Sequence, residues 1–340
     1  MQFLFPLIVL FGLIAMPDAA VKAASDAALL WWTRVLPSLL PYLIAAALLM
    51  KSDLLARIPK RLLPFFLLLL GALGGYPVGA KCAARLHAQG ALTRENANKV
   101  CAFINLPNPV FIISVVSVGF FGDPNAAAPL LIGVYAVALF GLIPLFRLPY
   151  EAHPEPEPTG PALTEAIRDG VHSIAMILGC LMFASVLCAL LGSAGVFRCL
   201  AALTGLPETT VQAVSGGLFE MTCGLREIAL SPMPLSIRLA LAAFFLQLGG
   251  GAILLQTASV FPISCSRYVS VKLLYAFCSA VIAGLLTPLF CSDAAVPTLA
   301  SGAKMLQNSV DLLSVCLSSA LGLLLVFVFT FGLGHQKRTP

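Results

Sequence analysis

Apolar runs of about twenty residues recur along the chain, and they limit its fold more than any other feature. Crossing about 30 Å of hydrocarbon takes roughly 20 helical residues. We expect spanning helices near residues 2–17, 27–50, 97–121, 126–147, 163–192, 236–262, 268–290 and 306–333. Only 10% of the 340 residues are charged, whereas a soluble domain carries roughly 25%. The sequence therefore predicts an all-α polytopic membrane protein with about eight transmembrane helices.

Two further apolar stretches, 62–90 and 208–231, are interrupted by Gly, Pro or charged residues, so that each half is too short to cross. Short apolar pieces of this kind are more often re-entrant or buried. In the first stretch, Gly71, Gly75 and Gly79 are spaced four apart, which permits close approach of backbones. We therefore expect two re-entrant hairpins, the first with its tip within 71–79.

The basic residues predict how the chain is oriented in the membrane. The loop 51–61 and the tail "HQKR" carry the cationic residues that favour the cytoplasmic side. With two hairpins that each enter and leave on one side, both termini lie in the cytoplasm. The first hairpin then opens to the cytoplasm and the second to the outside. The N-terminal apolar run has no preceding Lys or Arg, so we interpret it as a retained span and not a signal peptide.

The Pro-Glu-rich segment "EAHPEPEPTGPA" divides the chain into two halves that repeat one pattern: interrupted hairpin, interrupted span, whole span. "YPVGAK" (76–81) corresponds to "EMTCGLRE" (220–227), and "AFINLPNPVF" (102–111) to "AFFLQLGGGAIL" (243–254). The predicted organisation is N-terminal helices 1–61, first repeat 62–150, linker 151–162, connecting helix 163–207, second inverted repeat 208–290 and C-terminal helix with basic tail 291–340.

Several function classes are excluded by composition and motifs. The net charge of +5 is spread over short loops, which suits orientation in a bilayer and not binding to nucleic acid. The ten cysteines form no C-x-x-C pair and read as buried hydrophobes, so we expect no metal site. No Ser/His/Asp order, H-E-x-x-H pair or P-loop is present. We therefore expect neither an enzyme nor a cofactor.

The two interrupted spans contain polar candidates. In the first, Pro107 and Pro109 remove two helix donors, and the amides of Asn105 and Asn108 can bond either the freed carbonyls or a ligand. In the second, Gln247 precedes three glycines that allow a ligand to approach the backbone. The alternatives are a locally satisfied kink and close helix packing.

The hairpins contain the charged candidates. Glu220 lies at membrane depth, where a carboxylate is a functional candidate, and it would bind Na⁺, a proton or a solute donor. It either serves that role or pairs with Arg226. Lys81 faces either an anion in a cavity or the lipid headgroups. The candidate solute-binding residues are Gly75, Tyr76, Pro77, Gly79, Lys81, Asn105, Asn108, Glu220, Thr222, Gly224, Arg226, Gln247, Gly249 and Gly250.

Inverted repeats with interrupted helices at matching positions indicate a secondary transporter. The chain also resembles the sporulation integral membrane proteins of the YlbJ type, through "LGALGGYPVGAK", "GALTRENA", "FINLPNPVFIISVVSVGFFGDP" and "GLFEMTCGLREI". That family belongs to the nucleoside-recognition Gate domain group, related in architecture to concentrative nucleoside transporters.

The resemblance implies a bacterial cell membrane, a transport core of hairpins and broken helices, and a sporulation-linked role in moving dipicolinate. It also suggests a homo-oligomer, a trimer as in nucleoside carriers. We expect a transporter of a small polar solute, anionic or nucleoside-like, working by alternating access with Na⁺ or H⁺ as coupling ion. The alternative is a non-transporting sensor or scaffold needed for spore or envelope assembly.

Overall fold

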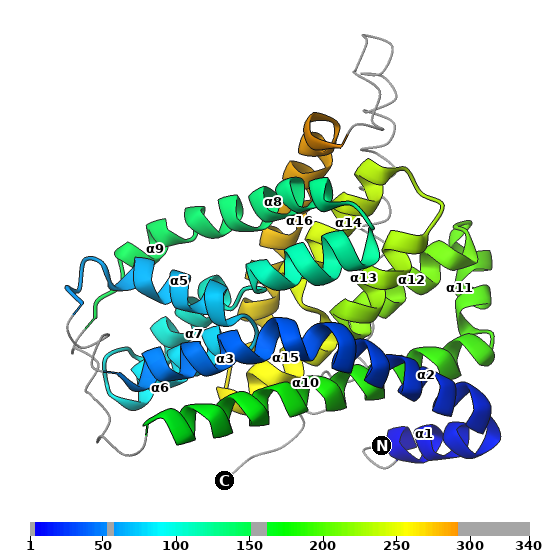
Figure 1. Ribbon diagram of the computed structural model, residues 1–340, viewed down its shortest axis with the longest axis horizontal. Helices are drawn as coiled ribbons and strands as arrows, with labels where there is room; N and C mark the ends of the chain where they lie inside the picture. Colours follow the sequence, from blue (N-terminus) through cyan, green and yellow to red (C-terminus); the bar gives the residue numbers. More distant parts are fainter. Residues whose placement is uncertain (1–3, 53–57, 151–161, 292–340) are drawn as a thin grey trace, which may run out of the picture.

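The computed structural model describes residues 4–52, 58–150 and 162–291, and within these ranges it contains helices and no strands (Figure 1). Five helices in this part of the chain are long and apolar enough to cross a membrane. They are Pro17–Lys51, Pro124–Phe146, Leu163–Ser193, Leu235–Val260 and Cys265–Phe290. The chain is thus a multi-pass membrane protein. The predicted span 306–333 lies outside the described residues.

Three predicted spans differ from the structure. The span 97–121 is divided into two helices, Arg94–Ile104 and Phe111–Phe120, and each is too short to cross alone. The stretch 2–17 forms α1 (Leu4–Ala15), which at 12 residues is shorter than a bilayer crossing. The predicted span 27–50 extends at its N-terminal side, because α2 (Pro17–Leu30), the π-helical η1 (Trp31–Val35) and α3 (Leu36–Lys51) form one continuous helix. The proline at the first turn of α2 suits a helix start.

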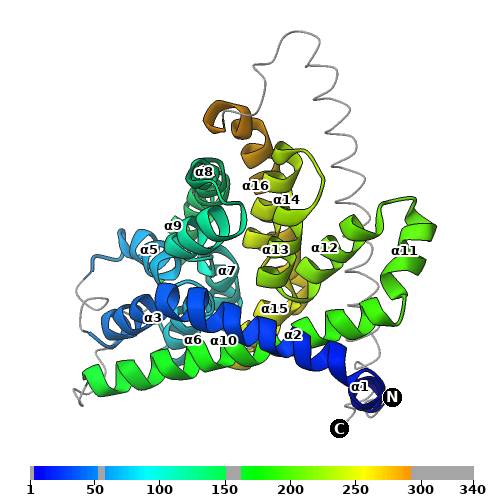
Figure 2. The ribbon, with the colours of Figure 1, turned by 45° about the vertical axis from the view of Figure 1, so that its right-hand side comes forward.

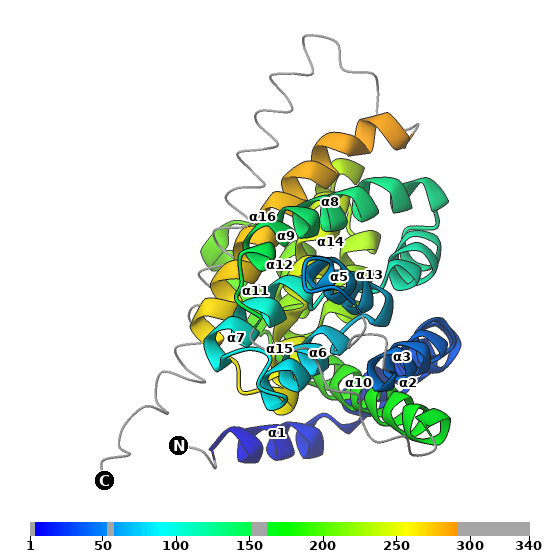
Figure 3. The same ribbon diagram turned by 90° about the vertical axis from the view of Figure 1, so that its left-hand side faces the viewer.

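This long helix packs along α10 (Ala162–Ser193), and we call the two the scaffold pair. The Trp31 indole donates to the Ile174 carbonyl at 3.0 Å. At one end Lys51 pairs with Glu165 at 3.1 Å and with Asp169 at 3.4 Å. Figure 3 shows α2, α3 and α10 gathered on one side of the molecule, away from α16.

The remaining helices form two units of the same order. The first unit has a hairpin, α5 (Leu63–Gly74) and α6 (Val78–Ala88), then a broken helix, α7 (Arg94–Ile104) and π-helical η2 (Phe111–Phe120). The short η3 (Pro124–Ala126), α8 (Ala127–Phe140) and α9 (Leu142–Phe146) complete it. The side chain of Thr93 caps α7 by accepting from the backbone N–H of Asn96.

The second unit follows α11 (Val196–Thr204). Its hairpin is α12 (Glu208–Phe219) and α13 (Met221–Leu230). Its broken helix is α14 (Leu235–Leu248) and α15 (Gly250–Val260), and its whole helix is α16 (Cys265–Phe290). Figure 2 shows the first unit, in cyan and teal, beside the second, in yellow-green to orange.

The broken helices of the two units run antiparallel. The start of the first lies beside the end of the second, since Arg94 donates to the Pro262 carbonyl at 3.4 Å and the Asn98 side chain accepts from Ser264 N–H at 2.7 Å. Near the other end, the Arg238 guanidinium lies 5.9 Å from the centre of the Phe121 ring.

An exposed ion pair adds to the first of these contacts. Glu95 accepts from Arg267 at 2.9 Å, and this hydrogen bond, with Lys99 nearby, lowers the pKa of the carboxyl group. The whole helices α8 and α16 are antiparallel as well, because Gly133 faces Ser279 and Ala283 while Gly141 faces Tyr275.

Candidate functional site

The first hairpin turns at Gly75–Pro77, and its tip seats against the break in the first broken helix. That break spans Asn105–Asn108, where the backbone leaves the helical conformation. A side chain on Gly71 would collide with the carbonyl of Ile104, and one on Gly79 would come within 2.5 Å of the Asn105 Cα. Both predicted interruptions are present, and the four-residue glycine spacing brings the two backbones into contact.

The second unit repeats this arrangement with different residues. Its hairpin turns at Glu220, and its broken helix is interrupted at Gly249, where φ is +82°. Gly250 also has a positive φ, +71°, and a side chain there would come within 2.7 Å of the Gly217 carbonyl. Gly224 packs directly on Gly217 inside the hairpin. Glycine is therefore required here for conformation and for close packing.

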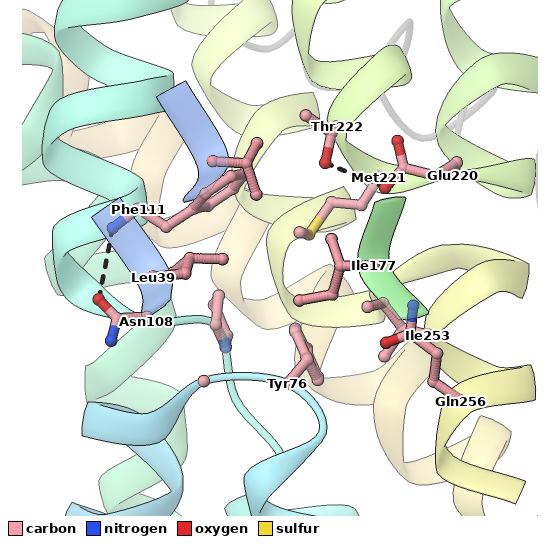
Figure 4. Close-up of a pocket in the computed structure, with 13 residues that line it drawn as sticks. Leu39, Tyr76, Asn108, Phe111, Ile177, Glu220, Met221, Thr222, Ile253 and Gln256 are labelled. Atoms are coloured by element: carbon pink, nitrogen blue, oxygen red, sulfur yellow. Dashed lines mark hydrogen bonds between the residues drawn. The ribbon is translucent and has the colours of Figure 1, made fainter. Parts of the chain in front are cut away.

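A cavity of about 40 Å³ lies between the two hairpin tips, the first break, α15 and the scaffold pair (Figure 4). Its lining comprises Val35, Leu39, Gly75, Tyr76, Pro107, Asn108, Phe111, Ile177, Glu220, Met221, Thr222, Ile253 and Gln256. In Figure 4, Asn108 and Phe111 lie on one side, with Glu220 and Thr222 on the other. A space of this size holds water molecules and not a drug-sized solute, for which pockets are roughly 300–1,000 Å³.

Glu220 caps the helix that begins after it. Its carboxylate accepts from the Cys223 backbone N–H at 2.8 Å and from the Thr222 hydroxyl at 3.0 Å. The residue is 5% exposed, and the N-terminal dipole of α13 favours a negative charge at this place. These contacts replace the predicted alternative of a pair with Arg226.

The two asparagines of the first break have different surroundings. Asn108 lines the cavity, accepts from Val110 N–H at 2.7 Å and donates to the Leu73 carbonyl of the first hairpin. Asn105 is fully buried outside the cavity lining and donates to Thr257 and Tyr268, each at 2.9 Å. Both amides thus tie the break to neighbouring elements.

Two buried glutamines keep polar atoms without a partner among the described residues. Gln247 is fully buried at the end of α14, and neither its amide nitrogen nor its oxygen is hydrogen-bonded. Gln256 lines the cavity, and its side-chain oxygen is also unsatisfied. Buried polar groups are nearly always paired, so these amides point to water or a ligand as the missing partner.

The structure also contains a buried cation that the sequence did not single out. Lys272, on α16, is fully buried. Its ammonium donates to the carbonyl of Asn105 and lies 3.5 Å from the Tyr76 hydroxyl. Tyr76 in turn donates to the carbonyls of Leu246 and Gln247, both at 3.1 Å. These contacts connect the first break, the first hairpin tip and the second break.

Five of the predicted solute-binding residues line one cavity: Gly75, Tyr76, Asn108, Glu220 and Thr222. Others lie elsewhere. Lys81 donates to Ser173 of α10 at 2.7 Å. Arg226 lines a separate cavity of about 530 Å³ between α2, α10 and the second hairpin.

The comparisons with known proteins give one clear similarity. No protein-family model matches the chain, and no solved structure matches it. The chain is 27% identical to the sporulation integral membrane protein YlbJ of Bacillus subtilis (strain 168), over 73% of this chain and 72% of that protein. Together with the apolar helices, this similarity supports a multi-pass membrane protein.

Proposed function

We propose that the chain is a membrane transporter that moves a small polar solute by alternating access. The two hairpins are re-entrant in this proposal, and the two antiparallel units form an inverted repeat. One observation carries it: each hairpin tip seats on the broken helix of its own unit, and both tips meet at one cavity, where four polar side chains lie among apolar ones. In an inverted repeat, exchange of the two units' conformations opens such a cavity to alternate sides.

The present volume of about 40 Å³ corresponds to an occluded conformation in this proposal. Entry of a ring-sized solute requires the hairpin tips to separate from the scaffold pair. The side chains that line the cavity there are mainly apolar, among them Leu39, Ile177 and Met221. No covalent link or ion pair among the described cavity-lining residues opposes that movement.

The chemistry of the lining favours a solute rich in hydrogen-bond donors and acceptors. Glu220, Thr222, Asn108 and Gln256 supply a carboxylate, a hydroxyl and two amides, while the lining contains no Lys or Arg. A nucleoside-like solute fits this set directly. Dipicolinate, which the family resemblance implies, would need cations such as Lys81 or Arg226 to approach in another conformation.

Binding and uptake with defined solutes test the proposal. Purified protein is heated with dipicolinate, uridine or adenosine, since a ligand that binds the folded state raises its apparent stability. Proteoliposomes are then assayed for uptake of the radiolabelled compounds. We expect Glu220→Gln and Asn108→Ala to lose uptake of the solute that the wild type takes up, while Glu208→Gln and Asn125→Ala, exposed residues of matched chemistry, retain it.

A non-transporting sensor or scaffold is the alternative, because the relative is named only as a sporulation protein. We propose that this chain likewise acts in spore formation. Complementation of a deletion strain separates the two functions. If the Glu220→Gln and Asn108→Ala variants restore sporulation fully and vesicles take up none of the compounds, the scaffold function is favoured.

A further inference from the structure

Lys272 occupies a cation site built from neutral groups. Among the described residues no carboxylate lies within ion-pair distance of its ammonium, which is fully buried. The surroundings are the Asn105 carbonyl, the Tyr76 hydroxyl and the faces of the Tyr76 and Tyr268 rings, whose centres lie 5.3 and 5.9 Å away. A buried charge with only such partners is costly and marks a functional position.

The groups around this ammonium are those that would otherwise hold a coupling cation. Carbonyl oxygens freed by an unwound helix coordinate Na⁺ in secondary transporters, and rings stabilise a cation that faces them. The Asn105 carbonyl belongs to such a break. In this chain the ammonium group of Lys272 occupies the position beside that carbonyl.

We propose that Lys272 is the proton-binding group that couples the two units, and that it takes the place of a Na⁺ ion at the first break. The proposal rests on the transport function above, and it assigns H⁺ as the coupling ion. The proton is taken up from water and returned to water, and the cavity lined by Tyr76, the residue whose hydroxyl contacts Lys272, can hold water.

Counting donors and acceptors shows how the proton would act. An ammonium has three donors and no acceptor. While Lys272 is charged, the Tyr76 oxygen accepts from it, and the Tyr76 hydrogen must go elsewhere, to the Leu246 and Gln247 carbonyls. The neutral amine gains a lone pair that can accept the Tyr76 hydrogen. Loss of the proton thus removes the bond between the first hairpin tip and the second break.

Few other titratable groups surround this position. Tyr268 lies on the same helix, Cys101 on α7 is near, and Tyr135 on α8 interacts with Tyr76. Gln247 and Thr257, from α14 and α15, are neutral. A pH-dependent change in the contact between hairpin tip and second break therefore belongs to Lys272.

Hydrogen–deuterium exchange of the full-length protein in lipid nanodiscs tests this without any solute. Exchange is followed from about pH 6 to pH 10, corrected for intrinsic rates, in peptides covering 72–80 and 244–252. In the wild type we expect both peptides to lose protection together as pH rises, by roughly five- to tenfold, the effect of one hydrogen bond. Replacing NaCl by choline chloride should change nothing.

The variants make the assignment specific. Lys272→Arg keeps its charge at every pH and should abolish the pH-dependent loss of protection. Lys99→Arg, an exposed control, should retain that loss. Should Lys272→Arg fail to fold, Tyr76→Phe decides. This variant retains the lysine and the ring beside it but lacks the hydroxyl that bonds the second break, so the pH-dependent loss of protection should be confined to the peptide 72–80.

The inference is overturned if the wild type shows no pH-dependent loss of protection. It is also overturned if that loss persists in Lys272→Arg, or in both peptides of Tyr76→Phe, or if protection depends on Na⁺. If vesicles take up a solute but hydrogen exchange shows no pH-dependent loss of protection, only this inference is removed. If the loss of protection is observed in protein that takes up none of the compounds, the role of Lys272 in the contact is supported and only the transport function is removed.

Discussion

At the scale of single residues, the site combines polar groups that serve the fold with groups that lack a partner. Glu220 and Asn108 bond the backbone next to them, so each stabilises the turn or break that places it. Gln247 has no such bond among the described residues and contributes no visible stabilisation. Substitutions at these positions should therefore separate stability from function.

Removing the Glu220 carboxylate should weaken the second hairpin. Glu220→Ala leaves the Cys223 N–H and the Thr222 hydroxyl without their acceptor, and loss of such a cap costs about 1–2 kcal/mol. Glu220→Gln, which keeps one oxygen, should cost about half as much. Thermal unfolding in detergent measures both. Glu208→Ala is the control, because the Glu208 carboxylate pairs with Arg198 on the exposed surface. Equal stability of Glu220→Ala and wild type would exclude the capping role.

Gln247→Leu should show the opposite behaviour. Replacing an unpaired buried amide by an apolar group of similar shape is nearly neutral or stabilising. We expect unfolding temperature to be unchanged or higher, while uptake in proteoliposomes is lost. A clear loss of stability would show that the amide has a structural partner, such as a bound water, in the resting protein.

At the scale of elements, glycine spacing determines how a hairpin meets a broken helix. Gly79 faces Asn105 with no room for a side chain, whereas Gly179, on α10, faces open space. Both are inside helices with ordinary backbone angles, so they form a matched pair for substitution.

Gly79→Ala should destabilise the protein by roughly 1–3 kcal/mol, because the added methyl group forces the backbones apart. Gly179→Ala should stabilise it by about 0.5–1 kcal/mol through lower chain entropy in the unfolded state. Chemical denaturation of the two variants beside the wild type checks the difference. Two variants of equal stability would contradict the close contact.

Much of this element order could be predicted, because glycine and proline signal a turn or break within a few residues. The predicted hairpin 208–231 agrees closely with Glu208–Leu230, and the break at Asn105–Asn108 falls within the predicted one. Lys272 could not be recognised in this way. It lies four residues inside the predicted span 268–290, where a lysine usually extends its side chain to the interface.

The contacts that make Lys272 and Tyr76 important join positions more than 160 residues apart. No local pattern in the sequence indicates such pairs. Likewise, Lys81 and Arg226 have the residue types that suit an anion, but the helix faces on which they lie turn them toward α10 and the separate cavity. Residue type alone therefore did not indicate that these two cations lie outside the cavity that Glu220 and Asn108 line.

At the scale of the whole molecule, the antiparallel units predict that the open ends of the two hairpins face opposite sides of the membrane. Arg94→Cys and Pro232→Cys place a thiol at each end, on exposed positions. In intact cells a membrane-impermeant thiol reagent should label Pro232→Cys, and only inverted vesicles should expose Arg94→Cys. The wild type gives the background of the native cysteines. Labelling of both positions from the same side would refute the inverted arrangement.

The scaffold pair has a further consequence through the continuous helix Pro17–Lys51. Its 35 residues extend about 52 Å at 1.5 Å each, well beyond about 30 Å of hydrocarbon. Such a helix either tilts or projects from the bilayer, and its tilt changes with the thickness of the bilayer. Since this helix and its partner α10 form a wall of the cavity, through Leu39 and Ile177, uptake should vary as the acyl chains of reconstituted vesicles are lengthened from about 14 to 22 carbons. The lipid that surrounds this protein would then act on it as an effector, by thickness alone.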